Sequence, residues 1–204
     1  MIRNVYCVGR NYKLHAQELG NDVPDEPMIF MKPSHAVVSL EESVLALPAD
    51  QGEIHYEGEI VLHIAQEYET GIQVNELVDQ MALGIDFTLR DVQNVIKKKG
   101  HPWTAAKGFK SSAPITSFIP FPGTDAILKQ DFTVIKNGIE VQRGNVSDMI
   151  FSLQDIVEYI GTHYGLGEGD IIFTGTPAGV GPTVSGDKFE LFWGEDQLGS
   201  CVIA

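Results

Sequence analysis

The chain has 204 residues, 43% of them hydrophobic, which is enough for one domain with a substantial core. Its formal net charge of -14 at pH 7 argues against nucleic acid and anionic membranes as partners, and no apolar run reaches the length of a membrane helix. The two cysteines, Cys7 and Cys201, fit neither a zinc site nor a disulfide framework, which predicts a reducing, cytoplasmic setting.

The first predicted elements are a strand over residues 2–8 and a short helix over residues 11–19. His15 and Glu18 lie three residues apart on that helix and therefore share a face. Taken alone, this pair is more typical of a solvated helix surface than of a catalytic pair. The polar, proline-containing end of the region indicates that residues 10–27 form a mobile lid. The next predicted elements are a strand over residues 28–31 and a hairpin made by residues 36–40 and 43–47.

Residues 53–63 predict a half-buried strand, because apolar side chains occupy alternate positions. Side chains of a strand point alternately to its two faces, so Glu57 and Glu59 point the same way. Two neighbouring carboxylates repel each other unless a cation or a shared proton lies between them. This face is therefore either washed by solvent or built to hold a positive charge.

Residues 81–88 predict a buried strand that contains Asp86. An ionised aspartate without a partner is unfavourable in an apolar strand. Asp86 is therefore either a turn residue at the end of the strand or a ligand of a cation. Thr88 and Asp91 fit a capping box at the start of a helix that runs to about residue 98.

A run of three lysines and then a single lysine follow. Lys97, Lys98 and Lys99 are typical of a solvated helix end that complements the helix dipole. Lys107 lies among small and aromatic residues, which is an unusual place for a lysine that serves only solubility.

The second half of the chain predicts more short strands. Asn137-Gly138 favours a hairpin with a type I′ turn, and Ser152 with Asp155 forms a capping box for a helix to about residue 163. After a strand over residues 170–174, the glycine-rich loop 175–181 can direct backbone N–H groups at an anion, although such loops are usually only turns. Many short strands without a βαβ rhythm predict an α+β fold with a mixed, rolled sheet.

Glu57, Glu59 and Asp86 together form an oxygen-rich set of ligands, which selects Mg²⁺ or Mn²⁺ over Zn²⁺ and leaves about three positions for water and substrate. A rival site would use His55 or His63, which share the face of the two glutamates, to bind Zn²⁺ or Fe²⁺. An anionic substrate at the acidic site requires positive charges from elsewhere. The candidates are Lys107, Arg10, Lys32 and Arg90, with the 175–181 loop for a carboxylate end.

The distinctive blocks are, in chain order, 7–12 (CVGRNY) with His15 and Glu18, 30–34 (FMKPS), 55–59 (HYEGE), Asp86 with 90–93 (RDVQ), 97–107 (KKKGHPWTAAK) and 174–181 (TGTPAGVG). Together they resemble the fumarylacetoacetate hydrolase superfamily over nearly the whole chain. Within that superfamily, the 97–107 block and the short length of the chain are most similar to those of the acylpyruvate hydrolase and oxaloacetate decarboxylase group.

This resemblance implies a β-rich roll of the C-terminal domain type in one catalytic domain over residues 1–204, and a homodimer. It implies Mg²⁺ or Mn²⁺ on Glu57, Glu59 and Asp86. The implied catalytic residues are His15 and Glu18 on the lid, with Lys107, and the residues expected near the substrate are Arg10, Arg90, Gln93, Gly175 and Thr176.

The implied reaction is cleavage of a carbon–carbon bond in a small anionic α-keto acid, through a pyruvate enolate that the metal stabilises. Two alternatives stay open: tautomerisation, isomerisation or hydration of oxaloacetate or 2-hydroxydienoate acids at the same site, and a non-catalytic domain that binds Ca²⁺.

Two departures from the family are visible. The larger relatives carry an N-terminal domain that is not in this sequence. Ala178 stands where many relatives have a charged residue, so the family pattern does not identify the group that binds the far end of the substrate.

Overall fold

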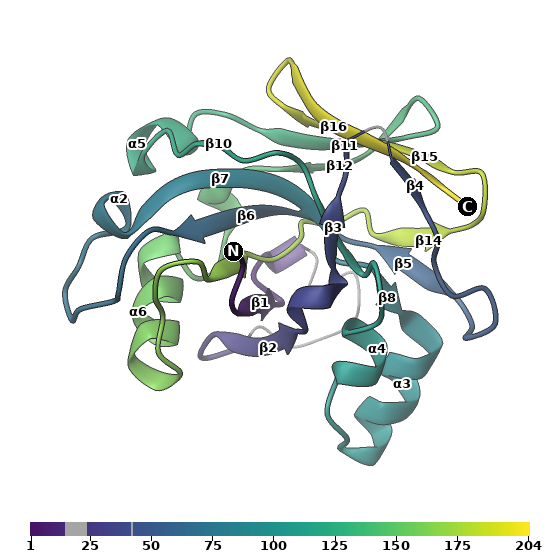
Figure 1. Ribbon diagram of the computed structural model, residues 1–204, viewed down its shortest axis with the longest axis horizontal. Helices are drawn as coiled ribbons and strands as arrows, with labels where there is room; N and C mark the ends of the chain where they lie inside the picture. The colour runs from purple at the N-terminus through teal and green to yellow at the C-terminus, as the bar shows by residue number, and fades with distance from the viewer. Residues whose placement is uncertain (15–23, 42) are drawn as a thin grey trace.

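The computed structural model describes residues 1–14, 24–41 and 43–204, apart from the side chain of Ser43. His15, Glu18 and most of the expected lid lie outside these described residues. Two sheets form the layers of the molecule, with few helices, which confirms the predicted α+β class (Figure 1). Of the helices in the described ranges, none is long and apolar enough to cross a membrane.

The larger sheet has eight strands and runs through the middle of the molecule. Its order is β2-β1-β13-β6-β7-β9-β3, with β10 also paired to β7. The strands are β1 Val5–Gly9, β2 Met28–Lys32, β3 Val37–Ser39, β6 Gly58–Ile64, β7 Val78–Ile85, β9 Ala113–Ile115, β10 Ile119–Pro120 and β13 Ile171–Phe173.

A second sheet packs over one face of β6 and β7, at the top of Figure 1. Its order is β12-β11-β15-β16-β4. The strands are β4 Ser43–Leu45, β11 Phe132–Lys136, β12 Ile139–Gly144, β15 Lys188–Trp193 and β16 Asp196–Ile203. A small third sheet, of order β14-β5-β8, contains β5 Ile54–Tyr56, β8 Thr88–Leu89 and β14 Gly181–Thr183.

Helices cover the edges of these layers. They are α2 Val74–Leu77, α3 Arg90–Lys99, α4 Thr104–Lys107, α5 Thr124–Ile127 and α6 Leu153–His163, with single 3₁₀ turns at Ser34–Ala36 and Val146–Asp148.

The main hydrophobic core lies between the two larger sheets, and a second cluster lies on the opposite face of the eight-stranded sheet. Ile60 and Leu62 of β6 join the main core, whereas Val61 belongs to the second cluster. The strand is therefore buried on both faces where it crosses the centre, rather than half-buried as its alternating pattern predicts. The reason is that the opposite face is itself covered by apolar side chains.

Local signals predicted two elements correctly. Asn137 and Gly138 have φ angles of 53° and 78°, as a type I′ turn requires, and they join β11 to β12. Ser152 and Asp155 form a reciprocal capping box, and α6 ends at His163 as expected.

Three other predictions are wrong. Residues 36–40 and 43–47 do not form a hairpin, because β3 pairs with β9 and β4 pairs with β16, both in parallel. The strand predicted over residues 53–63 is broken at Glu57, because β5 and β6 belong to different sheets.

The third error is the capping box at Thr88. Helix α3 begins at Arg90 without a side-chain cap. The two residues of the predicted box bond elsewhere: the Thr88 hydroxyl donates to the Asp86 carbonyl, and the Asp91 carboxylate accepts from the Glu53 backbone N–H.

Candidate active site

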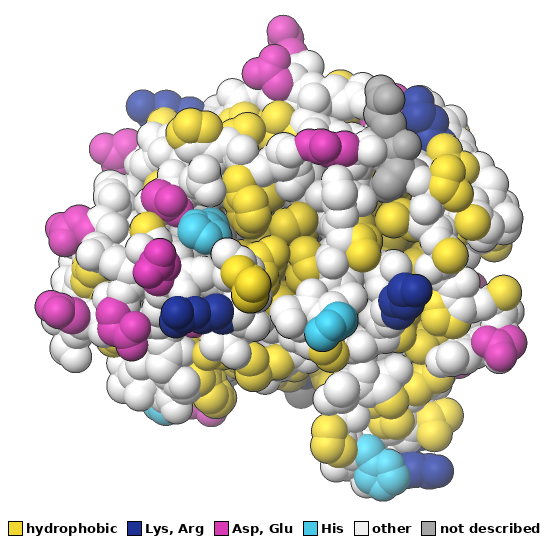
Figure 2. Space-filling view, viewed as in Figure 1, with side chains coloured by type: hydrophobic (Ala, Val, Ile, Leu, Met, Phe, Trp, Pro, Cys, Tyr) yellow, Lys and Arg dark blue, Asp and Glu magenta, His cyan; other side chains and the backbone are white. Residues whose placement is uncertain are grey.

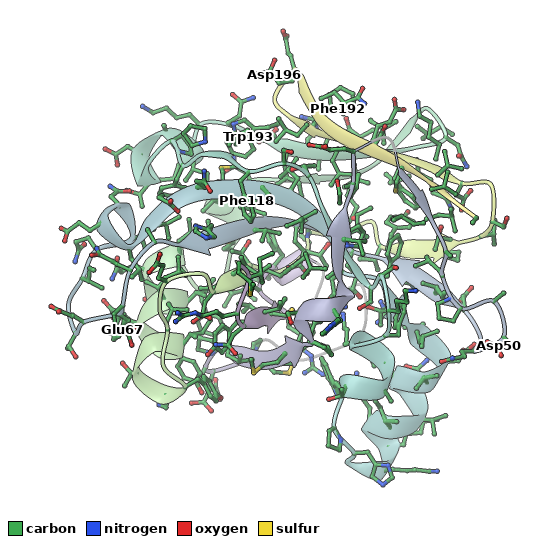
Figure 3. The ribbon with its side chains drawn as sticks, viewed as in Figure 1. Asp50, Glu67, Phe118, Phe192, Trp193 and Asp196 are labelled. Atoms are coloured by element: carbon green, nitrogen blue, oxygen red, sulfur yellow. The ribbon has the colours of Figure 1, made fainter. Side chains whose placement is uncertain are left out.

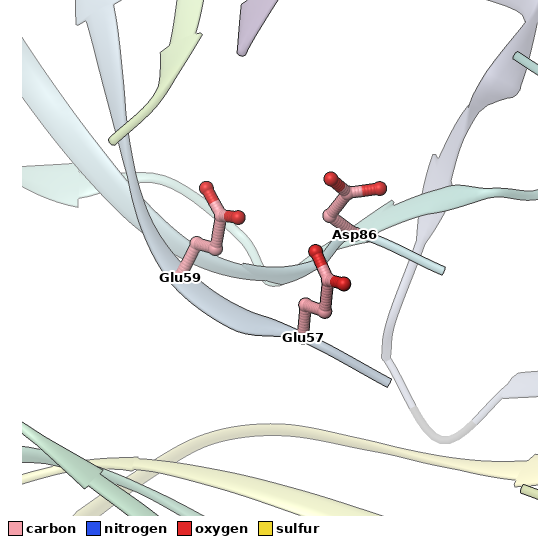
Figure 4. Close-up of side chains that lie close together, drawn as sticks. All are labelled: Glu57, Glu59 and Asp86. Atoms are coloured by element: carbon pink, nitrogen blue, oxygen red, sulfur yellow. The ribbon is translucent and has the colours of Figure 1, made fainter. Parts of the chain in front are cut away.

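Three carboxylates meet where β6 begins and β7 ends. The pairing of Gly58 with Ile85 and the bond from the Asp86 N–H to the Glu57 carbonyl (2.8 Å) bring the two chain segments together. Figure 4 shows the side chains of Glu57, Glu59 and Asp86 pointing to the same side of the strands. One oxygen from each lies within 4.8 Å of the others, and the residues are 6%, 2% and 0% exposed.

Burial of these carboxylates favours a positive partner. Burial raises the pKa of Glu59 well above its usual range, and the charges of Asp86 and Glu57 raise it further. The Gly175 N–H opposes this shift by donating to Glu59 Oε2 at 2.8 Å. The cluster therefore binds a proton or a cation readily.

The donor set fits a hard divalent ion. All three groups are carboxylates, and Asp86 Oδ1 is buried without a hydrogen bond, although Lys32 Nζ lies 2.8 Å away as an ion pair. The Lys32 ammonium engages one lone pair of this oxygen, and the second lone pair is available to a cation. Glu57, Glu59 and Asp86 are thus positioned to hold a hard divalent cation.

The two histidines of the rival site lie elsewhere. His55 pairs with Glu53 at 2.9 Å, and His63 pairs with Asp79 at 2.6 Å. Within the described residues, the carboxylate cluster includes no histidine, so the rival Zn²⁺ or Fe²⁺ site is not formed there. The two histidines and the two glutamates all occupy odd-numbered positions, which would place them on one face of a continuous strand. They lie apart because the chain passes from one sheet to another at Glu57.

Lys107, at the end of α4, is bound to two of the carboxylates. Its ammonium donates to Glu57 Oε2 at 2.7 Å and to Asp86 Oδ2 at 2.6 Å, and the residue is 2% exposed. Burial alone would lower the pKa of Lys107, but the two carboxylates outweigh it and the pKa is raised. Lys107 therefore supplies a permanent positive charge at neutral pH.

Arg90, the first residue of α3, extends the network. Its guanidinium donates to Glu57 Oε1 at 2.6 Å and to Gln93 Oε1 at 2.7 Å, while its buried Nε has no hydrogen bond. Since Gln93 lies one helical turn after Arg90, both side chains reach the same pocket.

Lys32 lies beneath the site rather than in it. Its side chain is fully buried, and its ammonium bonds to the carbonyls of Phe87, Lys107 and Ser112 and to the Ser112 hydroxyl. The expectation that Lys32 contacts substrate is therefore wrong, because backbone acceptors and Asp86 surround its charge. Lys32 instead fixes Asp86 and the end of α4.

The carboxylates open into a pocket of about 100 Å³. This volume suits a small organic acid rather than a large ligand. Residues from β1, β2, α3, α4 and the glycine-rich loop contribute. The lining residues are Val8, Gly9, Arg10, Met28, Phe30, Glu57, Glu59, Asp86, Arg90, Gln93, Asn94, Lys97, Trp103, Lys107 and Thr176.

Most of the residues expected at the site come together in this pocket: the three carboxylates, Lys107, Arg10, Arg90, Gln93 and Thr176. Gly175 lies beside it, with its N–H directed at Glu59. At φ 105° a side chain would be strained, and a Cβ would lie 2.7 Å from that of Asn11, so glycine is required here.

Lys97 is exposed in the last turn of α3, as the sequence predicts for the basic helix end. It also lines the pocket, whereas Lys98 and Lys99 do not. Arg90, Gln93, Asn94 and Lys97 follow the spacing i, i+3, i+4, i+7 of one helix face, and this periodicity was the signal that separates Lys97 from its neighbours.

The chain matches known proteins over nearly its full length. The model of the family "Fumarylacetoacetate (FAA) hydrolase C-terminal" matches residues 4–202. Oxaloacetate tautomerase YcgM of Escherichia coli is 36% identical over 207 residues, covering 99% of this chain and 93% of the relative. Human mitochondrial oxaloacetate tautomerase FAHD1 is 40% identical over 190 residues, with 92% and 86% covered.

The fold agrees with these matches. The crystal structure of fumarylpyruvate hydrolase from Pseudomonas aeruginosa, in complex with Mn²⁺ and pyruvate, superposes with a TM-score of 0.90 at 35% identity, covering 100% of this chain and 90% of that one. A family model spanning almost every residue and relatives well above 30% identity lead to one conclusion: this chain belongs to the fumarylacetoacetate (FAA) hydrolase family.

Proposed function

We propose that this protein cleaves a carbon–carbon bond in small β-keto or β-diketo acids, as an acylpyruvate hydrolase, an oxaloacetate decarboxylase or both. The observation that carries the proposal is the buried triad Glu57, Glu59 and Asp86 at the floor of a small pocket that cationic side chains also line. A solvated acidic surface would need neither this burial nor the adjoining Lys107.

The cofactor in this proposal is Mg²⁺ or Mn²⁺ on the triad. When bound, the ion supplies Lewis acidity that polarises the keto group of the substrate. The Mn²⁺ in the fumarylpyruvate hydrolase structure supports this choice.

The residues of this chain then take separate roles. Gly175 holds Glu59 in one orientation through its N–H. Lys107 places a positive charge next to the reacting groups, which offsets the negative charge that develops when the bond breaks. Arg90, Gln93 and Thr176 are placed to orient the carboxylate end of the substrate, because all three line the pocket.

Hydrolysis also needs a base for water. We assign this role to His15, oriented by Glu18, from the family resemblance alone, since both residues lie outside the described part of the chain. His15 would take a proton from water as the water oxygen bonds to the distal carbonyl carbon. The electron pair of the broken carbon–carbon bond then passes to the pyruvate half. Decarboxylation of oxaloacetate releases CO₂ and requires no such water.

Tautomerisation of oxaloacetate is the second candidate. The names of the Escherichia coli and human relatives favour it, and it needs only proton transfer next to the polarised keto group. The same triad and Lys107 serve both reactions.

A panel of substrates tests these proposals. Purified protein with Mg²⁺ or Mn²⁺ is given acetylpyruvate, keto oxaloacetate and enol oxaloacetate, and pyruvate release is measured separately from keto–enol interconversion. We expect pyruvate from at least one substrate and its loss with a chelator. His15→Ala and Glu18→Ala should abolish acetylpyruvate hydrolysis while leaving decarboxylation. Interconversion without any pyruvate release would reject cleavage in favour of tautomerisation.

We further propose that two copies pair into a homodimer and that the protein is cytoplasmic. A hollow lined by apolar side chains lies at the centre of the face shown in Figure 2. The second hydrophobic cluster also leaves Val37 and Phe118 only partly buried. Buried free Cys7 and Cys201 suit a reducing compartment, although several relatives are named as mitochondrial.

A further inference from the structure

A buried glutamine of the second sheet joins two segments of the candidate site. Gln142 lies on β12 and is 2% exposed (Figure 1). Its side-chain oxygen accepts a hydrogen bond from the Gly58 N–H at 2.8 Å. Its side-chain nitrogen donates to the Thr176 hydroxyl at 2.8 Å and to the Pro177 carbonyl at 3.0 Å. The amide therefore uses its oxygen and both of its N–H groups within the protein.

Gly58 is the residue between the two glutamates of the triad. Its carbonyl accepts from the Thr176 hydroxyl at 2.8 Å, so both of its backbone polar groups bind the pair formed by Gln142 and Thr176. A Cβ on Gly58 would lie 2.3 Å from Val134 Cγ2, so only glycine lets the second sheet approach this closely. The peptide units on either side of Gly58 carry the two glutamates, and their orientation determines where both carboxylates point.

The glycine-rich loop stays beside β6 after the pairing of β13 with β6 ends. Thr174 donates to the Ile60 carbonyl through its N–H at 3.0 Å and its hydroxyl at 2.9 Å. Gly175 then donates to Glu59 Oε2. Gln142 secures the next step of this series, and it comes from a different sheet. The loop, β6 and the second sheet are thus joined at one buried amide.

Thr176 transmits this arrangement to the pocket. It lines the pocket together with the triad, whereas Gln142 is not among the described lining residues. A hydroxyl has one proton, and that of Thr176 goes to the Gly58 carbonyl. The bond from Gln142 to the hydroxyl oxygen favours this orientation, because it occupies a lone pair and leaves the proton directed at Gly58. Gln142 therefore acts on the site through other residues.

We propose that Gln142 is a positioning residue for the reaction. It holds residues 57–59 and the glycine-rich loop at a fixed spacing, so that Glu57 and Glu59 keep the geometry that a divalent ion requires. The inference rests on the proposed function for the identity of the ion. Partners one step beyond metal ligands typically change metal affinity or activity by about 10- to 100-fold when they are removed. A glutamine that only stabilised the fold would leave the bound ion unaltered.

Gln142→Leu tests the proposal, because it keeps the approximate size of the side chain and removes all of its hydrogen bonds. We expect the Kd of Mn²⁺ in calorimetry to rise about tenfold. The electron paramagnetic resonance spectrum of the bound Mn²⁺ should also change, since the ligands shift. At saturating Mn²⁺, kcat should fall about tenfold while KM stays within about threefold.

Gln154 provides the matched control, because its amide makes the same kinds of bonds away from the site. Its oxygen accepts from the Val74 N–H at 3.0 Å, and its nitrogen donates to the Ile72 carbonyl at 3.0 Å. Gln154→Leu should lower the melting temperature but leave the Mn²⁺ affinity, the spectrum and kcat unchanged. If Gln142→Leu behaves like this control, the positioning role is overturned.

A double-variant cycle tests the path through Thr176. Thr176→Val removes the hydroxyl that Gln142 binds and keeps the shape of the side chain. If both residues act through this bond, the double variant should bind Mn²⁺ within about twofold of the weaker single variant. Losses that multiply would show that the residues act independently and would overturn the path.

Gln142→Asn decides the question if Gln142→Leu does not fold. It keeps the amide but withdraws it by one methylene, and we expect the same change in spectrum with a Kd for Mn²⁺ raised about threefold or more. An unchanged Kd and spectrum would overturn the proposal. If the wild-type protein binds Mn²⁺ but converts none of the substrates in the panel, the proposed function fails, while calorimetry and the spectrum still decide the role of Gln142.

Discussion

Single carboxylates decide whether a cation binds at the base of the pocket. Glu57, Glu59 and Asp86 are almost completely buried, so the loss of any one removes both a ligand and a charge that water cannot replace. The remaining carboxylates would then be neutralised by the neighbouring Lys107, Arg90 and Lys32 rather than by a metal ion.

We predict that Asp86→Ala and Glu57→Ala each weaken Mn²⁺ binding by at least about 100-fold and abolish every activity together. Calorimetry with Mn²⁺ measures the first effect directly. Glu53→Ala is the control, since this carboxylate pairs with His55 on the exposed side of the same region. Retained Mn²⁺ affinity in the Asp86 variant would show that other ligands hold the ion. Greater thermal stabilisation by Ca²⁺ than by Mg²⁺ or Mn²⁺ would favour a structural site.

Lys32 illustrates a charged residue whose role is structural. Its ammonium is enclosed by three carbonyls, the Ser112 hydroxyl and the Asp86 carboxylate. Lys32→Met would keep the approximate length of the side chain but leave Asp86 with one cation fewer and remove the ammonium donor from the Phe87 carbonyl.

We predict that Lys32→Met lowers the free energy of unfolding by about 3–5 kcal/mol, as expected when one partner of a buried ion pair is removed. Urea unfolding measures this change. Ser112→Ala removes a single hydroxyl from the same group and should cost only about 1 kcal/mol. A Lys32 variant as stable as the Ser112 variant would contradict the anchoring role.

Among the elements, the β11–β12 hairpin depends on an interaction far along the chain. The Asp187 carboxylate accepts bonds from Asn137 Nδ2 (2.7 Å), the Val184 N–H (2.8 Å) and the Thr183 hydroxyl (3.2 Å), and it pairs with Lys136 at 2.8 Å. Partial burial would raise the pKa of Asp187, but these donors outweigh it and the pKa is lowered. A lowered pKa stabilises the folded protein above the pKa of the unfolded chain, and this contribution is lost as the pH falls.

We therefore predict that Asp187→Asn is about 1–2 kcal/mol less stable than the wild type at pH 7, and that the difference shrinks as the pH falls below about 4. Chemical unfolding from pH 3 to 7 measures both trends. Asp196→Asn, at the exposed tip of the neighbouring hairpin (Figure 3), is the control and should change little. Parallel pH curves for Asp187→Asn and wild type would contradict the prediction.

At the scale of the whole molecule, the apolar hollow of Figure 2 requires an explanation. Val5, Val61 and Ala82 of the eight-stranded sheet form part of the second hydrophobic cluster, and the partly exposed Val37 and Phe118 pack against it. Figure 3 places Phe118 next to β7 on this face. A second copy that packs on this face would remove the exposed apolar surface of Val37 and Phe118 from water.

We predict that the protein sediments as a dimer at micromolar concentration and that Phe118→Asp shifts it to monomers, because burying the new charge in the interface is unfavourable. Analytical ultracentrifugation measures the mass. Ile139→Asp introduces the same charge at an exposed apolar residue of β12 and should leave the dimer intact. A wild-type monomer at these concentrations would reject the proposed pairing.

The sequence by itself determined the features that depend on neighbouring residues and on composition. The α+β class, the type I′ turn at Asn137 and the capping box at Ser152 follow from local geometry, so their motifs are sufficient. The acidic triad was also predicted from residue type, because carboxylates beside apolar residues need a cation when they are buried together.

Only the tertiary structure decided which residues share the pocket. The break of residues 53–63 at Glu57, which separates His55 from the cluster, arises because two sheets meet there. Lys32 was enclosed and Lys97 was brought to the mouth by the packing of β2, α3 and α4, which join segments distant in sequence. Long-range contacts of this kind leave no local pattern, because the burial of a charge depends on which other segments surround it.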